Sequence, residues 1–87
     1  MPYYTYVIYS EKFQKIYIGF SNDLEARLYD HNVRAKKGYT LRFRPWILVH
    51  FEEFKSKKEA MIRERQLKTA KGREFIHDQI NRHYKTK

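Results

Sequence analysis

The first part of the chain carries two short runs of aromatic and β-branched residues. One run spans residues 3–9 and the other spans residues 16–20, with the polar residues 10–12 between them. Aromatic and β-branched residues favour strands, and a short polar interruption favours a turn between two strands. The pattern predicts a β-hairpin whose second strand ends at about Gly19.

A helix is predicted directly after the hairpin. Residues 21–23 are Ser-Asn-Asp, all common at helix N-termini, and Glu25 stands three positions after Asn22 as in a capping box. We expect this helix to run from about residue 23 to residue 32. Within it Leu24 and Leu28 lie one turn apart and form an apolar stripe.

The same helix carries two polar residues that can share a target. Arg27 and His31 are four positions apart, so their side chains project from one face of the helix, beside the leucine stripe. We expect both side chains to point toward the same place. In the alternative interpretation Arg27 is a solvated surface residue, and His31 with Asn32 terminates the helix.

The second half of the chain predicts one more strand and two more helices. Residues 45–51 form an apolar run that we interpret as a buried strand opened by Pro45, with Trp46 in the core. Ser56 and Glu59 form a second capping box, which begins a helix expected to reach about residue 70.

A stop signal separates this helix from the last one. Lys71-Gly72 is expected to end the first of the two helices, because glycine commonly follows a helix C-terminus. The final helix should span about residues 73–84, with Phe75, Ile76 and Ile80 on its apolar side. The element order β-β-α-β-α-α predicts an α+β fold, a small and mostly antiparallel three-stranded sheet flanked by helices, in a single domain over residues 1–87.

Composition narrows the class of protein. A hydrophobic content of 41% with 17% aromatic residues is too apolar for a disordered chain. The chain has no cysteine, which excludes disulfides, thiolate zinc sites and cysteine nucleophiles. Residues 1–4 do not resemble the start of a signal peptide, and no apolar run approaches membrane-spanning length. We therefore expect a cytoplasmic protein with no membrane partner.

A formal net charge of +9 favours a polyanionic partner, above all nucleic acid. The charge is concentrated in residues 34–44, here named the basic segment, which contains no acidic residue. Its cations are Arg34, Lys36, Lys37, Arg42 and Arg44, and they are interleaved with Tyr39 and Phe43. The segment is predicted to bind DNA, with RNA as an alternative, although a high charge can also serve solubility alone.

Several common active sites can be set aside. There is no GxxxxGK[ST] or GxGxxG loop, so we expect no nucleotide cofactor. The four histidines do not form an HExxH pair, which argues against a histidine zinc site. No GxSxG motif marks a serine nucleophile.

The remaining polar residues follow the order of a known family. Residues 17–19 read Tyr-Ile-Gly, and Tyr6 on the first strand stands as the last residue of a degenerate partner motif, followed along the chain by Arg27, His31 and a helix with a central Glu64. In these features the chain resembles the GIY-YIG nuclease family, specifically its small stand-alone bacterial members. The first motif keeps only the final tyrosine of Gly-Ile-Tyr. The resemblance covers nearly the whole chain and implies a metal-dependent endonuclease that hydrolyses phosphodiester bonds in DNA, in repair or recombination.

The resemblance also implies a role for each of five residues. Glu64 is similar to the carboxylate that holds one Mg²⁺ or Mn²⁺ ion, chiefly through water and a substrate phosphate, as suits a cation that keeps much of its hydration. Arg27 is similar to the arginine that stabilises the transition state at the scissile phosphate. Tyr17 resembles the general base or water-positioning group, and Tyr6 and His31 complete the network. Because a phenol is a weak base at neutral pH, the choice of proton acceptor between Tyr17 and His31 stays open.

Three functions compete at this point. They are a metal-dependent endonuclease, a non-catalytic nucleic-acid-binding module with the same fold, and a structural protein whose charge is incidental. A binding module needs lysines and arginines but no Glu64, so the enzyme is favoured. Glu64 could instead form a surface ion pair with Lys68 one turn later. The apolar neighbours Ala60 and Leu67 favour a Glu64 side chain that faces inward.

Overall fold

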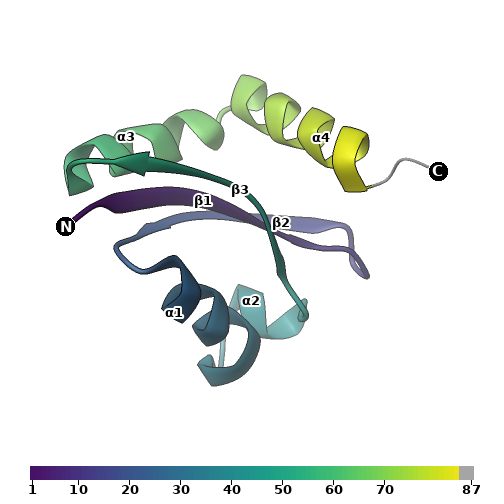
Figure 1. The fold of residues 1–87 in the computed structure, drawn as a ribbon. Helices are drawn as coiled ribbons and strands as arrows, with labels where there is room; N and C mark the ends of the chain where they lie inside the picture. Colours follow the sequence, from purple (N-terminus) through teal and green to yellow (C-terminus); the bar gives the residue numbers. More distant parts are fainter. Residues whose placement is uncertain (85–87) are drawn as a thin grey trace.

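The computed structural model describes residues 1–84 and consists of a three-stranded sheet with helices on both faces (Figure 1). The strands are β1 (Tyr3–Ser10), β2 (Lys15–Ser21) and β3 (Ile47–Phe54), in the order β2-β1-β3 and antiparallel throughout. One face is covered by α3 (Lys57–Leu67) and α4 (Ala70–Tyr84). The other face is covered by α1 (Leu24–Tyr29), the π-helical turn η1 (Asp30–Arg34) and the short α2 (Tyr39–Arg42). The predicted α+β class and antiparallel sheet are confirmed.

The central strand β1 is buried on both faces, so two apolar layers form around it. Val7 and Tyr9 face α3 and α4, where they pack with Leu67, Ile76 and Ile80. Tyr6 and Ile8 face the opposite side, where they pack with Trp46 and, at its margin, with Leu24 and Leu28. Alternation along a strand sends successive side chains to opposite faces, which explains the two layers. The core positions predicted for Trp46, Ile76 and Ile80 are confirmed, whereas Phe75, predicted beside them on the apolar side of the last helix, is 39% exposed.

The third strand departs from its predicted burial. It extends to Phe54 rather than ending at residue 51, and it lies at an edge of the sheet, paired only with β1. None of its residues is fully buried, and Phe51 is 52% exposed. The expectation of a buried third strand was therefore wrong. An apolar run does not reveal whether the strand has one neighbour or two.

The first predicted helix and the basic segment also differ in detail. The regular helix α1 ends at Tyr29, and the chain continues through η1 as a π-helical turn. Asp23 caps α1 by accepting a hydrogen bond from the amide of Ala26. The basic segment, for which the sequence pattern predicts no helix, includes α2, whose Thr40 is buried. The carbonyl of Thr40 accepts a hydrogen bond from the indole nitrogen of Trp46 at 2.8 Å, which anchors the segment to the core.

The boundary between the last two helices lies earlier than predicted. The helix α3 ends at Leu67 and α4 begins at Ala70, so Gly72 lies inside α4 rather than ending α3. A Cβ atom on Gly72 would lie 2.5 Å from Cα of Leu67. Glycine is therefore present because the two helices approach closely, and not as a helix terminator. Ser56 caps α3 as predicted, accepting from the amide of Glu59. Within residues 1–84, no helix combines the length and apolarity needed to cross a membrane.

Candidate functional site

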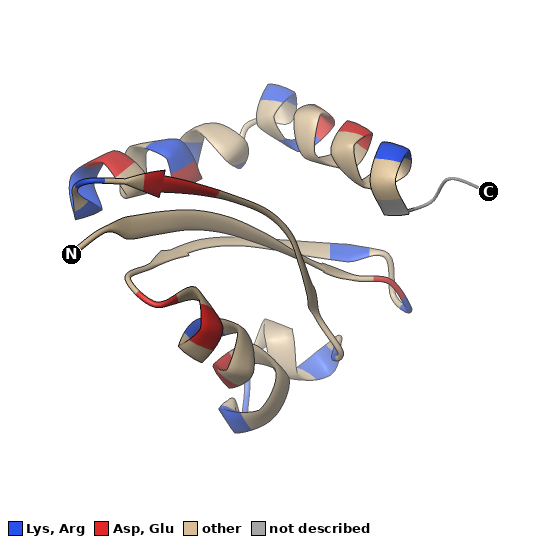
Figure 2. Ribbon diagram, in the orientation of Figure 1, with Lys and Arg blue, Asp and Glu red and all other residues tan. Residues whose placement is uncertain are grey.

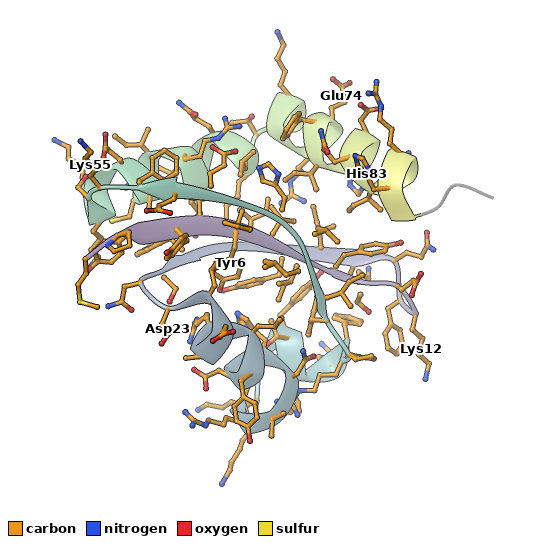
Figure 3. The ribbon with its side chains drawn as sticks, in the orientation of Figure 1. Tyr6, Lys12, Asp23, Lys55, Glu74 and His83 are labelled. Carbon is orange, nitrogen blue, oxygen red and sulfur yellow. The ribbon has the colours of Figure 1, made fainter. Side chains whose placement is uncertain are left out.

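Tyr6 lies at the centre of the site and owes its position to a glycine on the next strand. Tyr6 and Gly19 are directly opposite each other in the β1–β2 pair. A Cβ atom on Gly19 would lie 2.7 Å from the Tyr6 hydroxyl oxygen and 3.2 Å from a ring carbon of Tyr17. Without a side chain at position 19, the Tyr6 ring extends over β2 toward Tyr17. Figure 3 shows Tyr6 between the sheet and the layer that contains α1.

The Tyr6 hydroxyl is hydrogen-bonded to a buried histidine. Its oxygen lies 2.9 Å from Nε2 of His31, and both side chains are almost completely buried. Burial, together with the positive charges of Arg27 and Arg44, lowers the pKa of His31 to about 4, against the opposing effect of Asp30. His31 is therefore neutral at pH 7, and its Nε2 can accept the hydroxyl proton in a hydrogen bond.

Burial also holds Tyr6 in its protonated form. Desolvation raises the pKa of Tyr6 to about 12, against the opposing effect of the neighbouring Arg27 guanidinium. A phenol with this pKa keeps its proton at neutral pH and can act as a hydrogen-bond donor but not as a base. The pair of Tyr6 and His31 is consequently neutral and fixed in orientation.

Arg27 and Tyr17 open onto a shallow cavity next to this pair, here named the first hollow. Its volume is about 220 Å³, and its lining includes Tyr17, Arg27, Asp30, His31, Lys37, Tyr39 and Thr40. The Arg27 side chain is 44% exposed and only loosely paired with Asp30, at 3.8 Å. Its charge also interacts with the phenols of Tyr6 and Tyr17. The predicted convergence of Arg27 and His31 on one place is seen here, with His31 at the buried end and Arg27 at the open end.

Tyr17 differs from Tyr6 in that its hydroxyl is available. Its ring packs on His31, with the ring centroids 4.9 Å apart, and also contacts Tyr6 and Tyr39. Over residues 1–84 the structure assigns the Tyr17 hydroxyl no hydrogen-bond partner. The ring is thus fixed by packing while the oxygen can bind a water or a ligand.

Glu64 lies on the other side of the sheet from α1 and is not part of the lining of the first hollow. It lies on α3, its side chain is 18% exposed, and its carboxylate accepts from Nζ of Lys68 at 3.1 Å. The negative charge of Glu64 contributes to the raised pKa of Tyr6, after desolvation and the neighbouring Tyr17, so the two side chains are within electrostatic reach. Both sequence interpretations of Glu64 therefore hold in part, because the side chain is mostly buried and also paired with Lys68.

The donor atoms fit a weakly held, hydrated cation. No cluster of three or more His, Asp or Glu side chains able to enclose a metal ion occurs in the part of the chain that the structure describes. A single carboxylate such as Glu64 suits Mg²⁺ or Mn²⁺, which can retain water ligands and complete their coordination with a substrate phosphate. It does not suit an ion that needs a complete cage of protein ligands.

The five cations of the basic segment fall into two groups. Arg34 stacks on the ring of Tyr29 and pairs with Asp30 at 3.3 Å, while Arg44 donates to the carbonyls of His31 and Ala35, both at 2.7 Å. These two arginines are engaged within the protein. Arg34 nevertheless remains 70% exposed, whereas Lys36, Lys37 and Arg42 are exposed without such a partner in the described residues, and Lys37 lines the first hollow. Between η1 and β3 the ribbon shows basic positions and no acidic ones (Figure 2).

Two residues that support the site have roles that the sequence pattern does not reveal. The pattern predicts Gly19 as the end of a strand, yet it makes room for Tyr6; a glycine inside a strand often marks such a close approach. In the alternative interpretation Asn32 helps to terminate the helix, yet its side chain accepts from the amide of Trp46 at 2.6 Å and donates to its carbonyl at 3.0 Å. Nothing in the local sequence indicates this link between η1 and the start of β3.

Comparison with known proteins agrees with this geometry. A family model described as the GIY-YIG catalytic domain matches residues 2–79. The chain is 40% identical over 67 residues to UPF0213 protein SH2523 of Staphylococcus haemolyticus, covering 77% of this chain and 80% of that protein. It is 33% identical over 67 residues to UPF0213 protein HQ_3675A of Haloquadratum walsbyi, covering 77% and 74%.

A solved structure shares the fold. The solution NMR structure of the UPF0213 protein BH0048 from Bacillus halodurans superposes with a TM-score of 0.53 at 28% identity, covering 90% of this chain and 84% of that one. The resemblance inferred from the order of motifs is confirmed by the family match, which spans both tyrosines, the helix of Arg27 and the glutamate of α3. The chain belongs to the GIY-YIG catalytic-domain family, which is an endonuclease superfamily.

Proposed function

We propose that this protein is an endonuclease that hydrolyses phosphodiester bonds in DNA with the help of one Mg²⁺ or Mn²⁺ ion. The observation that carries the proposal is the convergence of Tyr17, Arg27 and the Tyr6–His31 pair on the first hollow, with Glu64 within electrostatic reach. A pure binding module has no need of a neutral, buried Tyr-His pair or of an acidic side chain beside a basic surface. Repair or recombination in the cytoplasm is the setting that this proposal implies.

The scissile phosphate would lie in the first hollow beside Arg27. In hydrolysis a water oxygen attacks phosphorus while the bond from phosphorus to the leaving oxygen breaks, and negative charge builds up on the phosphoryl oxygens. Arg27 is partly exposed and remains charged at every relevant pH, so it can donate to those oxygens in the transition state. Lys37, on the same hollow, adds a second positive charge.

Tyr17 is the residue that we assign to the attacking water. Its hydroxyl is available beside Arg27 in the lining of the first hollow, where it can hold the water through a hydrogen bond. His31 is poorly suited to the same task, because its Nε2 is engaged with Tyr6 and because burial lowers its pKa to about 4. We assign to Tyr6 and His31 the role of holding the wall of the hollow in shape, with Tyr6 donating rather than accepting protons.

Glu64 would hold the metal ion. When bound, such an ion supplies Lewis-acid stabilisation of the phosphate and of the leaving oxygen. The contribution of the protein is to present one carboxylate from a rigid helix and to leave the other coordination positions for water and substrate. Lys68 neutralises the charge of Glu64 in this structure, and a bound cation would neutralise it in place of Lys68.

The test is incubation of the purified protein with labelled duplex, branched, nicked and single-stranded DNA, and with RNA, with and without Mg²⁺ or Mn²⁺. Wild type should cut at least one DNA only when the metal is present, and Glu64→Ala should cut none. Binding of DNA in metal-free buffer should stay level or tighten in Glu64→Ala, because a negative charge has been removed near a polyanion.

Two results would contradict the proposal. If wild type binds DNA but cuts no substrate with either metal, the non-catalytic binding module is the better description. If wild type and Glu64→Ala cut alike in preparations free of contaminating nuclease, Glu64 is not the metal ligand. Lys68→Ala is a useful companion, since it removes the ion-pair partner of Glu64 while leaving the carboxylate in place.

A further inference from the structure

A second hollow lies beside the first, across the edge of β2. It is lined by Ile16, Tyr17, Ile18, Tyr39, Lys68 and Arg73 and has a volume of about 270 Å³. Tyr17 and Tyr39 line both hollows and stand with their ring centroids 6.3 Å apart. The Tyr39 hydroxyl donates to the carbonyl of Ile16 at 3.3 Å, which ties α2 to the edge strand. Two tyrosine rings therefore form the wall between two adjoining hollows.

The chemistry of the second hollow suits a nucleotide. Its only charged lining residues among those described are Lys68 and Arg73, and both are exposed cations. Ile16, Ile18 and the two tyrosines supply an apolar and aromatic surface. A positive charge that contacts phosphate, next to aromatic rings that contact sugar or base, is the combination by which proteins follow a polynucleotide strand.

Arg73 is the cation that is free to bind an anion here. Its Nε donates to the carbonyl of Lys68 at 3.2 Å, which positions the side chain over the end of α3. The terminal nitrogens carry the remaining N–H donors of the guanidinium, in a geometry that matches two phosphate oxygens. Lys68 is shared, because its Nζ lies 3.1 Å from Glu64 while the residue also lines the second hollow.

We propose that the second hollow binds the sugar-phosphate backbone of the nucleotide next to the one that is cut, with the phosphate held by Arg73 and Lys68. The inference rests on the proposed function, which puts the scissile phosphate in the first hollow. The strand then crosses the edge of β2 over Tyr17 and Tyr39. A volume of about 270 Å³ is below the range of roughly 300–1,000 Å³ typical of pockets that enclose a whole ligand, as suits one unit of a longer chain.

Lys71 provides a matched control for Arg73. Both residues lie in the first turn of α4, and replacing either with glutamine removes one positive charge. Lys71 lines different cavities, one of which it shares with Glu74, Phe75 and Asp78. Arg73→Gln keeps an N–H donor that can reach the carbonyl of Lys68, so the end of α3 should be preserved.

The experiment measures the affinity of wild type, Arg73→Gln and Lys71→Gln for fluorescein-labelled single-stranded and duplex oligonucleotides in EDTA, over a range of salt concentrations. Arg73→Gln should reduce the slope of log K against log salt by about 0.9 for duplex DNA, or about 0.7 if the bound backbone is single-stranded. Lys71→Gln should leave the slope of wild type unchanged. Tyr39→Leu should weaken binding on the order of tenfold if the ring stacks on the substrate.

The outcomes separate this inference from the proposed function. If wild type binds DNA without ever cutting it, but the salt slope falls in Arg73→Gln and not in Lys71→Gln, the second hollow is a backbone site and the nuclease proposal is wrong. If wild type cuts DNA while Arg73→Gln and Lys71→Gln have equal slopes, the second hollow is not a backbone site and the nuclease proposal stands. Failure of wild type to bind any oligonucleotide overturns the inference. Thermal unfolding of each variant verifies that the compared proteins are folded.

Discussion

The hydroxyl oxygen of Tyr6 lies 2.9 Å from Nε2 of His31, which links the central strand to the π-helical turn across 25 positions of sequence. Both groups are buried, and the hydrogen bond satisfies each of them. An unpaired buried polar atom costs about 1–3 kcal/mol, so the bond stabilises the fold chiefly by avoiding that cost. The same bond fixes His31 in the lining of the first hollow, beside Arg27 and Tyr17.

The first prediction concerns pH. The pKa of His31 falls from 6.5 to about 4 in the folded protein, with burial as the largest cause. Between these values the unfolded chain binds a proton that the folded protein does not. The stabilisation is therefore complete above about pH 6.5 and decreases as the pH falls toward 4, by up to about 3 kcal/mol. Urea unfolding between about pH 7 and pH 5 should show this decrease.

His31→Gln is the control for the pH experiment, because glutamine can still bond to Tyr6 but does not titrate. Its stability should be nearly flat in the upper part of this window. Titration of Glu52 does not account for a change in stability between pH 7 and pH 5. Burial raises the pKa of the Glu52 carboxyl, but hydrogen bonds from Arg63 and His50 lower it more, so its contribution is lost only below its ordinary value of 4.5. A wild type whose stability does not change from pH 7 to 5 would contradict a neutral, buried His31.

The second prediction concerns Gly19. Gly19→Ala places a methyl group 2.7 Å from the Tyr6 hydroxyl oxygen, so Tyr6 must move and its bond to His31 must weaken. We expect a loss of about 1–3 kcal/mol in the free energy of unfolding, as for other overpacked cores, and a large loss of cleavage. The double variant Tyr6→Phe, Gly19→Ala should lose less stability than the sum of the two single changes, because both changes disrupt the same bond to His31, although the Tyr6 ring carbon 2.9 Å from the added methyl remains. Strict additivity would mean that Gly19 has another role.

The third prediction separates structural from binding cations in the basic segment. Arg44→Ala leaves the carbonyls of His31 and Ala35 without their donor, so it should destabilise the fold by about 2 kcal/mol. Neutralising Lys36, Lys37 and Arg42 together should change stability little, since all three are exposed. That triple variant should instead lower the salt dependence of DNA binding by about 0.9 for each phosphate that the protein no longer neutralises. If Arg44→Ala changed the salt dependence and the triple variant changed the stability, the DNA-binding surface would lie elsewhere.

Features of this fold that depend on neighbours in sequence were predicted well. The hairpin of β1 and β2 and the cap at Ser56 follow from residues within a few positions of one another. Features that depend on distant parts of the chain were not predicted. Gly72 reads as a helix terminator unless the approach of α4 to Leu67 is known, and the burial of β3 depends on the number of neighbouring strands.

In the candidate site too, features set by nearby residues were predicted and features set by distant residues were not. Spacing alone predicts that Arg27 and His31 share a face, and the structure agrees. The hydrogen bond from Tyr6 to His31 depends on the packing of η1 against β1, which no local pattern reveals. The sequence leaves open whether Tyr17 or His31 accepts a proton, because both residues are chemically able to do so. Burial separates them, since His31 is enclosed and bonded while Tyr17 lines the first hollow with its hydroxyl available.

The last prediction uses the two tyrosines as a matched pair. Tyr17→Phe keeps the ring that packs on His31 and removes a hydroxyl with no partner in residues 1–84, so stability should change by less than about 0.5 kcal/mol. Cleavage should fall by about 10²–10⁴-fold if that oxygen orients or deprotonates the attacking water. Tyr6→Phe removes an equally small group but leaves His31 Nε2 buried and unpaired, so it should cost about 1–3 kcal/mol of stability. Urea unfolding and single-turnover cleavage on both variants check the contrast. Near-normal cleavage by Tyr17→Phe would transfer the water-activating role to another group, and His31→Gln, which keeps the bond to Tyr6, would then be the variant expected to lose activity.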